Sequence, residues 1–155
     1  MPGLPRFQVI DLGVVEGNNN MVHAINNSGC VVGSAADGAN GVQAFVFDGC
    51  RSRLGTLGGA FSIAHAINNA GQIVSGSLTD GNDAFHAFMF TDGNMHDLNQ
   101  LLVDAPRWEL LQAAGINDQG QIVGVGLLDG EDHGFLLNPA RCDRLSSLPG
   151  VDPCK

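Results

Sequence analysis

The residues of this chain that could do chemistry on a ligand lie beside one irregular segment, residues 101–114. Trp108 belongs to this segment, and His96 and Asp97 lie just before it. An indole ring offers a flat apolar platform, while an imidazole and a carboxylate can exchange protons. No Ser-His-Asp or Cys-His arrangement accompanies them. We therefore predict Trp108, His96 and Asp97 as ligand-binding residues and assign no catalytic residue.

Two acidic loops carry the oxygen atoms that calcium binds. Asp80 and Asp83 lie on one loop, and Asp129 and Asp132 lie on an equivalent one. Calcium takes carboxylate and carbonyl ligands from such loops, but the alternating Asp-x-Asp-x-Asp-Gly plan is missing. Ordinary turn chemistry, which Asp-Gly pairs favour, is the preferred interpretation, with calcium as the alternative.

The four cysteines form two candidate pairs. Cys30 opens one expected strand and Cys50 follows its antiparallel neighbour, so a disulfide between them is geometrically plausible. Cys142 and Cys154 would form the second pair. Two disulfides would indicate an oxidising compartment, and the alternative is four free thiols.

Charge and hydropathy exclude several partners. The 155 residues carry a formal net charge of −9, with 7 basic and 16 acidic residues. Nucleic-acid binding depends on clustered Lys and Arg, so we expect no nucleic-acid partner. No run approaches the roughly 20 apolar residues of a membrane span, and residues 1–7 lack the plan of a signal peptide.

The dominant feature of the chain is a repeat of about 45 residues that occurs three times. An Ile-Asn-x-x-Gly core is followed by a Phe-containing segment and preceded by a leading motif with a central leucine. The cores are residues 23–33, 65–75 and 114–124, the Phe segments 43–47, 86–90 and 133–137, and the leading motifs 11–13, 53–55 and 97–99. A fourth leading motif at residues 144–150 has no core after it. The chain is thus one repeat domain over residues 1–155, with units at about 7–50, 51–94 and 95–139 and a spare leading strand and tail at 140–155.

Local chemistry makes each unit a meander of four short strands. Asn and Gly in each core favour a tight turn, and the apolar runs after it are β-branched. The Phe segments are apolar on both faces, which predicts small sheets that stack face to face. Residues 101–114 are expected to form a helical turn or an extended loop over one edge.

Four-stranded units of 40–50 residues are typical of β-propeller blades. Three blades make half a ring, so we expect a second copy to complete a six-bladed homodimer. A β-trefoil is the alternative fold, because it also holds three four-stranded units in about 150 residues.

Equivalent histidines recur in the units. His23 and His65 share one position, and His86 and His133 share another. No His-x-x-x-His or Cys-x-x-Cys spacing supports a metal site, so we expect each imidazole to hydrogen-bond to the backbone of a neighbouring unit.

The core pattern followed by His86-Ala87-Phe88 resembles the HAF repeat family of probable extracellular bacterial proteins. The first unit departs from it with Gln43, and the third departs with Gly134. The resemblance covers about residues 7–139 and implies a location outside the cell or in the envelope. A cytoplasmic location is the alternative, because residues 1–7 lack the plan of a signal peptide. It brings no catalytic residues. Together with the repeats it predicts a non-enzymatic scaffold for a protein or glycan ligand. The alternative is a propeller-type hydrolase or lyase with its site near residues 101–114.

Overall fold

The protein is all-β, as its sequence predicts. The computed structural model describes residues 3–13, 20–36, 38 and 41–140. In chain order its elements are β1 (Asn20–Ile25), β2 (Val31–Ala36), β3 (Val42–Phe47), β4 (Arg51–Gly55), β5 (Gly58–Ile67), β6 (Ile73–Thr79), the 3-10 helix η1 (Asp80–Asn82), β7 (Phe85–Thr91), β8 (Asn94–Asp97), the 3-10 helix η2 (Leu98–Leu101), β9 (Trp108–Ile116), β10 (Ile122–Leu128) and β11 (Glu131–Leu137).

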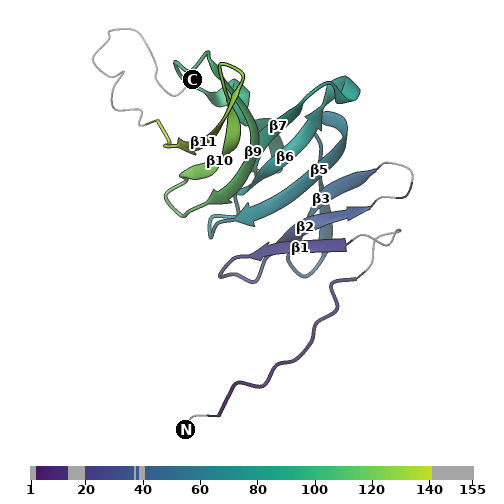
Figure 1. Ribbon diagram of the computed structural model, residues 1–155. Coiled ribbons are helices and arrows are strands. Elements are labelled where there is room, and N and C mark those ends of the chain that lie inside the picture. Colours follow the sequence, from purple (N-terminus) through teal and green to yellow (C-terminus); the bar gives the residue numbers. More distant parts are fainter. Residues whose placement is uncertain (1–2, 14–19, 37, 39–40, 141–155) are drawn as a thin grey trace.

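Three antiparallel meanders lie side by side (Figure 1). We call β1–β4 the first sheet, β5–β8 the second sheet and β9–β11 the third sheet. A single parallel residue pair, Val42 with Phe61, joins the first two into one eight-stranded sheet. Each meander contains one Ile-Asn core and one Phe segment.

The strands that carry the leading motif do not open their sheets, contrary to the predicted strand order. β4 pairs with β3, and β8 pairs with β7, so each leading motif closes the sheet before it. The sheets are therefore offset by one strand from the predicted units. A hairpin of two or three residues joins each of these pairs, and such short connections favour antiparallel neighbours.

The irregular segment forms neither a helical turn nor an extended edge loop along its whole length. Its second half lies in β9, the first strand of the third sheet. The Asn99 side chain from η2 holds this strand, since its Nδ2 donates to Leu110 O at 2.9 Å and its Oδ1 accepts from Leu110 N at 2.7 Å. A side-chain amide thus replaces a strand neighbour at that point.

The stacking predicted from the Phe segments is confirmed. Phe45, Phe88 and Phe135 are all buried. One apolar cluster lies between the first and second sheets, and another lies between the second and third. The second sheet contributes to both, because Ile73 belongs to the first cluster and Val74 to the second. Both faces of the second sheet are thus removed from water, which explains why β7 does not alternate apolar and polar residues. One face of β11 stays open, because Leu136 is 56% exposed.

Each core turn has its left-handed residue at glycine and not at asparagine. Gly29, Gly71 and Gly120 have φ of +81°, +80° and +75°. The asparagine two or three places earlier instead uses its side chain, as described below.

The described residues form neither a closed ring nor a closed barrel. The number of blades, and the choice between propeller and trefoil, therefore stay predictions. The spare leading strand lies outside the described residues. None of the helices described is long and apolar enough to cross a membrane.

Candidate functional site

The three residues predicted to bind a ligand do not form one cluster. Asp97 is nearly buried at the end of β8, whereas its neighbour His96 is exposed. Trp108 opens β9 and contacts His133 edge-on, with ring centroids 6.0 Å apart. Asp97 and Trp108 thus each lie beside a histidine, and these histidines were not among the predicted site residues.

His86 lies between two carboxylates. Its Nδ1 is 2.7 Å from Asp97 Oδ2, and its Nε2 is 3.8 Å from Glu109 Oε1. Asp97 also accepts a hydrogen bond from Asn99 N, which fixes the carboxylate. An imidazole oriented by a carboxylate can transfer protons, which is the feature a hydrolase would need here. The β7–β8 register brings His86 and Asp97 together across eleven residues, so a local motif search misses the pair.

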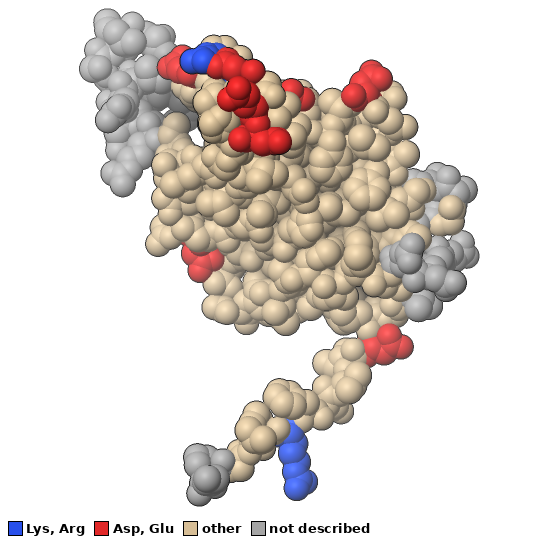
Figure 2. Space-filling view, viewed as in Figure 1, with Lys and Arg blue, Asp and Glu red and all other residues tan. Residues whose placement is uncertain are grey.

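The acidic loops have partners within the protein. Asp129 forms an ion pair with Arg107, and Asp80 accepts from Gly81 N at 3.1 Å. Among the described residues, no three His, Cys, Asp or Glu side chains gather where a metal could be held. Calcium stays a prediction, and the observed contacts agree with turn chemistry. Figure 2 shows the acidic side chains of one face gathered mainly at one end of the molecule, while its broad middle carries none.

Cys30 and Cys50 are free thiols in the structure. The β2–β3 register pairs Val31 with Phe47, so the residue opposite Cys30 is Asp48 and Cys50 lies two places further on. The disulfide stays a prediction. Its partner pair, Cys142 and Cys154, lies outside the described residues.

Equivalent positions of successive units meet at His23 and His65. The two rings are 4.7 Å apart in a T-shaped contact. His65 Nδ1 is 2.5 Å from Ser75 Oγ and 3.0 Å from Gln112 Nε2, which comes from the third sheet. His65 thus contacts a side chain of a neighbouring unit, whereas the sequence led us to expect a backbone partner. Burial, and then the nearby His23, lower the pKa of His65 below its ordinary value of 6.5.

Stability is expected to fall on acidification because of His65. In the folded chain its pKa lies below 6.5, so the unfolded chain binds more protons just below that pH. The contribution of neutral His65 to the free energy of unfolding is complete above about pH 6.5. It is lost as the pH falls towards the pKa that His65 has in the folded chain. Denaturant titrations between pH 8 and 5 would measure it. We expect His65→Gln to flatten the profile and His23→Gln to flatten it less, because burial is the larger cause. An unchanged profile in His65→Gln would contradict this assignment.

A ladder of hydrogen bonds links the three core turns. Asn26 Nδ2 donates to Asn68 O at 3.1 Å, and Asn68 Nδ2 donates to Asn117 O at 3.0 Å. The next residue of each turn adds a second rung. Asn27 N donates to Asn69 Oδ1, and Asn69 N donates to Asp118 Oδ1, both at 2.8 Å. The ladder has a direction, because each turn donates to the turn of the following sheet.

The last rung holds a carboxylate in its charged form. The backbone N–H of Asn69, and then its side-chain amide, lower the pKa of Asp118 below the ordinary 3.8. The side-chain bond from Asn69 Nδ2 to Asp118 Oδ2 measures 2.8 Å. The sequence marks these positions only as turn residues.

The two ends of the stack expose apolar side chains that the interior repeats bury. On the outer face of the third sheet, Val123 is 46% exposed, whereas its equivalents Val32 and Val74 are 0% exposed. On the outer face of the first sheet, Val22 is 55% exposed, whereas its equivalent Ala64 is 0% exposed. The two ends therefore expose apolar positions whose equivalents in the interior lie between neighbouring sheets. Exposed apolar patches of this kind mark interaction surfaces.

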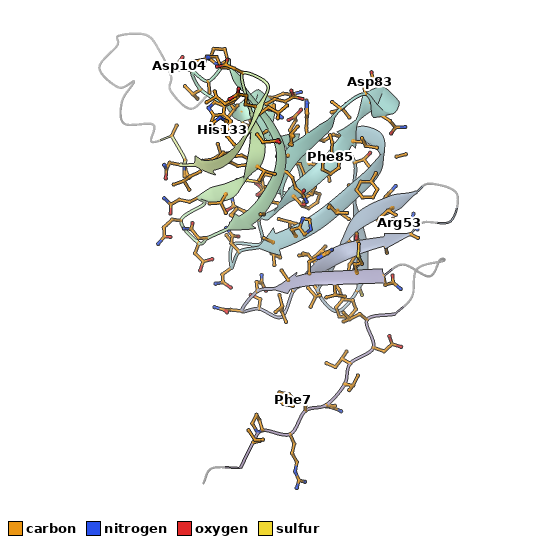
Figure 3. The ribbon with its side chains drawn as sticks, in the orientation of Figure 1. Phe7, Arg53, Asp83, Phe85, Asp104 and His133 are labelled. Carbon is orange, nitrogen blue, oxygen red and sulfur yellow. The ribbon has the colours of Figure 1, made fainter. Side chains whose placement is uncertain are left out.

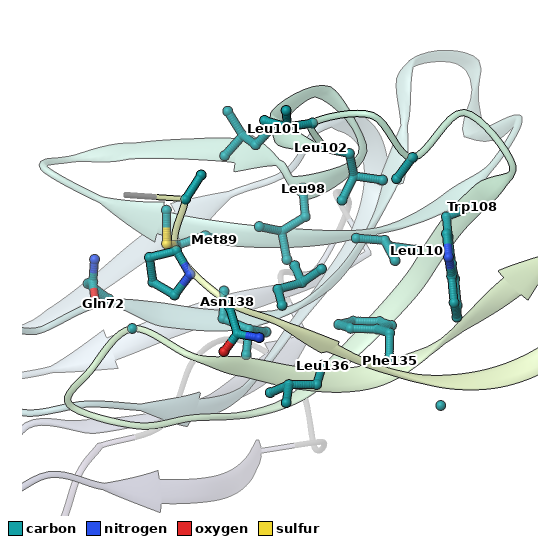
Figure 4. Close-up of a pocket in the computed structure, with 18 residues that line it drawn as sticks. Gln72, Met89, Leu98, Leu101, Leu102, Trp108, Leu110, Phe135, Leu136 and Asn138 are labelled. Atoms are coloured by element: carbon teal, nitrogen blue, oxygen red, sulfur yellow. The ribbon is translucent and has the colours of Figure 1, made fainter. Parts of the chain in front are cut away.

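An apolar groove of about 620 Å³ lies between the second and third sheets, beside β11 (Figure 4). Leu98, Trp108, Leu110 and Phe135 line it. Trp108, one of the predicted ligand-binding residues, is thus placed on a surface that an apolar group could fill.

Comparisons with protein-family models, with curated proteins and with solved structures find no match to this chain. The HAF resemblance therefore stays a prediction. The sequence predicted Asp97 and Trp108 as ligand-binding residues, and this stays a prediction. It did not predict the ladder or the exposed apolar ends of the stack. The repetition of Asn at one position of each core was a signal for the ladder. Apolar residues at equivalent positions of the first and last units were a signal for the exposed ends.

Proposed function

We propose that the protein is a non-enzymatic β-repeat scaffold whose three sheets are the blades of half a propeller. Two copies would close a six-bladed ring, in which the third sheet of each copy packs on the first sheet of the other. The ring would present its loops to a protein or glycan ligand. The HAF resemblance supports a place outside the cell or in the envelope.

The observation that carries this proposal is the match between the two ends of the stack. Val22 and Ile25 on the first sheet are exposed, and so are Val123 and Leu136 on the third. The ladder has the same polarity at both ends. In the ring, the side-chain amide of Asn117 and the backbone N–H of Asp118 would donate to the first core turn of the other copy. Asn68 and Asn69 donate to the third turn in the same way within one chain.

A closed arrangement also satisfies both ends at once. If the third sheet of one copy receives the first sheet of another, a two-fold axis creates the second contact without any new surface. An open arrangement would leave one apolar end in water at each terminus of a growing chain. Burying apolar area stabilises the closed form by roughly 25 cal/mol for each Å² removed from water.

Light scattering tests the proposal through the mass in solution. We expect a particle of twice 16.1 kDa for the full chain. Val123→Lys should return the mass to 16.1 kDa, because a charge placed in the contact loses its water. The variant should stay folded, since Val123 is half exposed in the single chain.

Gln100→Lys adds the same charge at an exposed position of η2 and serves as the control. It should keep the double mass. A full chain that stays at 16.1 kDa at all concentrations would refute the two-copy ring.

A further inference from the structure

The N-terminal arm, residues 3–13, leaves the sheets although it is apolar (Figures 1 and 3). Leu4, Phe7, Val9 and Ile10 are 93%, 88%, 92% and 73% exposed. Exposing four large apolar side chains on one short segment is unfavourable, because the free-energy cost grows with the apolar area left in water. Packing the arm against another surface would remove these side chains from water.

The arm has the sequence position of a fourth strand. Its motif Asp11-Leu12-Gly13 is equivalent to Arg53-Leu54-Gly55, which lies in β4. Leu12 precedes His23 by eleven residues, as Leu54 precedes His65. Because β4 closes the sheet before the one that β5 opens, the arm belongs to a sheet that precedes β1.

The third sheet offers the matching edge. Among the described residues β11 pairs only with β10, whereas β3 and β7 each pair with a fourth strand. An edge strand of this kind can accept an added strand through its free backbone groups.

The groove beside β11 lies where a side chain from a fourth strand of the third sheet would pack. Between the first and second sheets, Met95 of β8 packs against the cluster that contains Leu54, Ile73 and Phe88. The equivalent residues Leu98, Ile122 and Phe135 line the groove, where the third sheet has no such strand among the described residues. Counting back two places from the leading motif, the equivalent of Met95 in the arm is Val9.

We propose that the arm of each copy adds to β11 of the other copy as the fourth strand of its third sheet, with Val9 in the groove. This exchange rests on the two-copy ring proposed above, which brings β1 of one copy next to the third sheet of the other. It connects sheets between copies as the β4–β5 connection does within one copy. The rival occupant of the edge is the same chain's own motif at Leu145.

The register follows from β8. There Phe90 pairs with Met95, and Met89 pairs with His96. Translated to the third sheet, Leu137 faces Val9 and Leu136 faces Ile10. Cysteines at a directly opposed pair are close enough to bridge, whereas cysteines on opposite faces are not.

The test is oxidation of full-length variants in which all four natural cysteines are serine. We expect Ile10→Cys with Leu136→Cys to shift the chain on a non-reducing gel from 16.1 kDa to twice that mass. Val9→Cys with Leu136→Cys, which would point to opposite faces, should stay at 16.1 kDa and is the matched control. Leu136→Cys with Asp143→Cys reports the rival, because it would close a bridge within one chain.

The outcomes separate this exchange from the ring itself. A particle of double mass in which the Ile10 pair fails to cross-link, or in which the Asp143 pair closes within one chain, overturns the exchange and leaves the ring. A single-chain mass with no cross-link overturns both. Cross-linking by the Ile10 pair alone supports both.

Discussion

Phe88→Ala is expected to lower the free energy of unfolding by about 3–5 kcal/mol. Phe88 is fully buried between the first and second sheets, in the cluster that also holds Val32 and Ile73. Removing the phenyl ring leaves a cavity between the two sheets. The strands on both sides cannot easily move to fill it, because backbone hydrogen bonds hold them to their neighbours. Urea denaturation followed by circular dichroism would measure the loss.

Phe7→Ala is the matched control for this substitution. It makes the same change on the arm, where the ring is 88% exposed, so the single chain should lose little stability. If the two variants were destabilised equally, the second sheet would not be the shared core of the fold.

Asn68→Ala is expected to lower the free energy of unfolding by about 1–3 kcal/mol, since buried groups lose their partners. Asn68 is 4% exposed. Its Oδ1 accepts from Gln72 N at 2.9 Å, and its Nδ2 donates to Asn117 O on the next sheet. The substitution therefore breaks both the turn and the ladder.

Asn117→Ala separates these two effects. Asn117 makes the same turn bonds, with Gln119 N at 3.1 Å and Gln121 N at 2.9 Å, but it is exposed and ends the ladder within one chain. We expect a smaller loss in the single chain, and thermal unfolding of the two variants in the Val123→Lys background, which keeps the chains apart, would compare them. Equal losses would show that the ladder adds nothing to the turns.

The sequence by itself determined the repeating architecture. Turn residues and β-branched runs act locally, so the Asn-x-x-Gly turns and the strands that follow them were readable one unit at a time. The burial of Phe45 and Phe88 on stacked sheets followed from the lack of a polar face in their strands. The expectation that no nucleic acid binds also rests on the acidic composition, and it stays a prediction.

Tertiary structure alone decided how the units share their strands. A leading motif can hydrogen-bond to the strand before it or to the strand after it, and its own residues do not distinguish these choices. The register of β7 and β8 then brought His86 to Asp97, and the stacking of sheets brought His65 to Gln112. Such contacts depend on pairing between segments that are distant in the chain. Local preference cannot specify them, because only the mutual burial of whole sheets fixes which edges and faces meet.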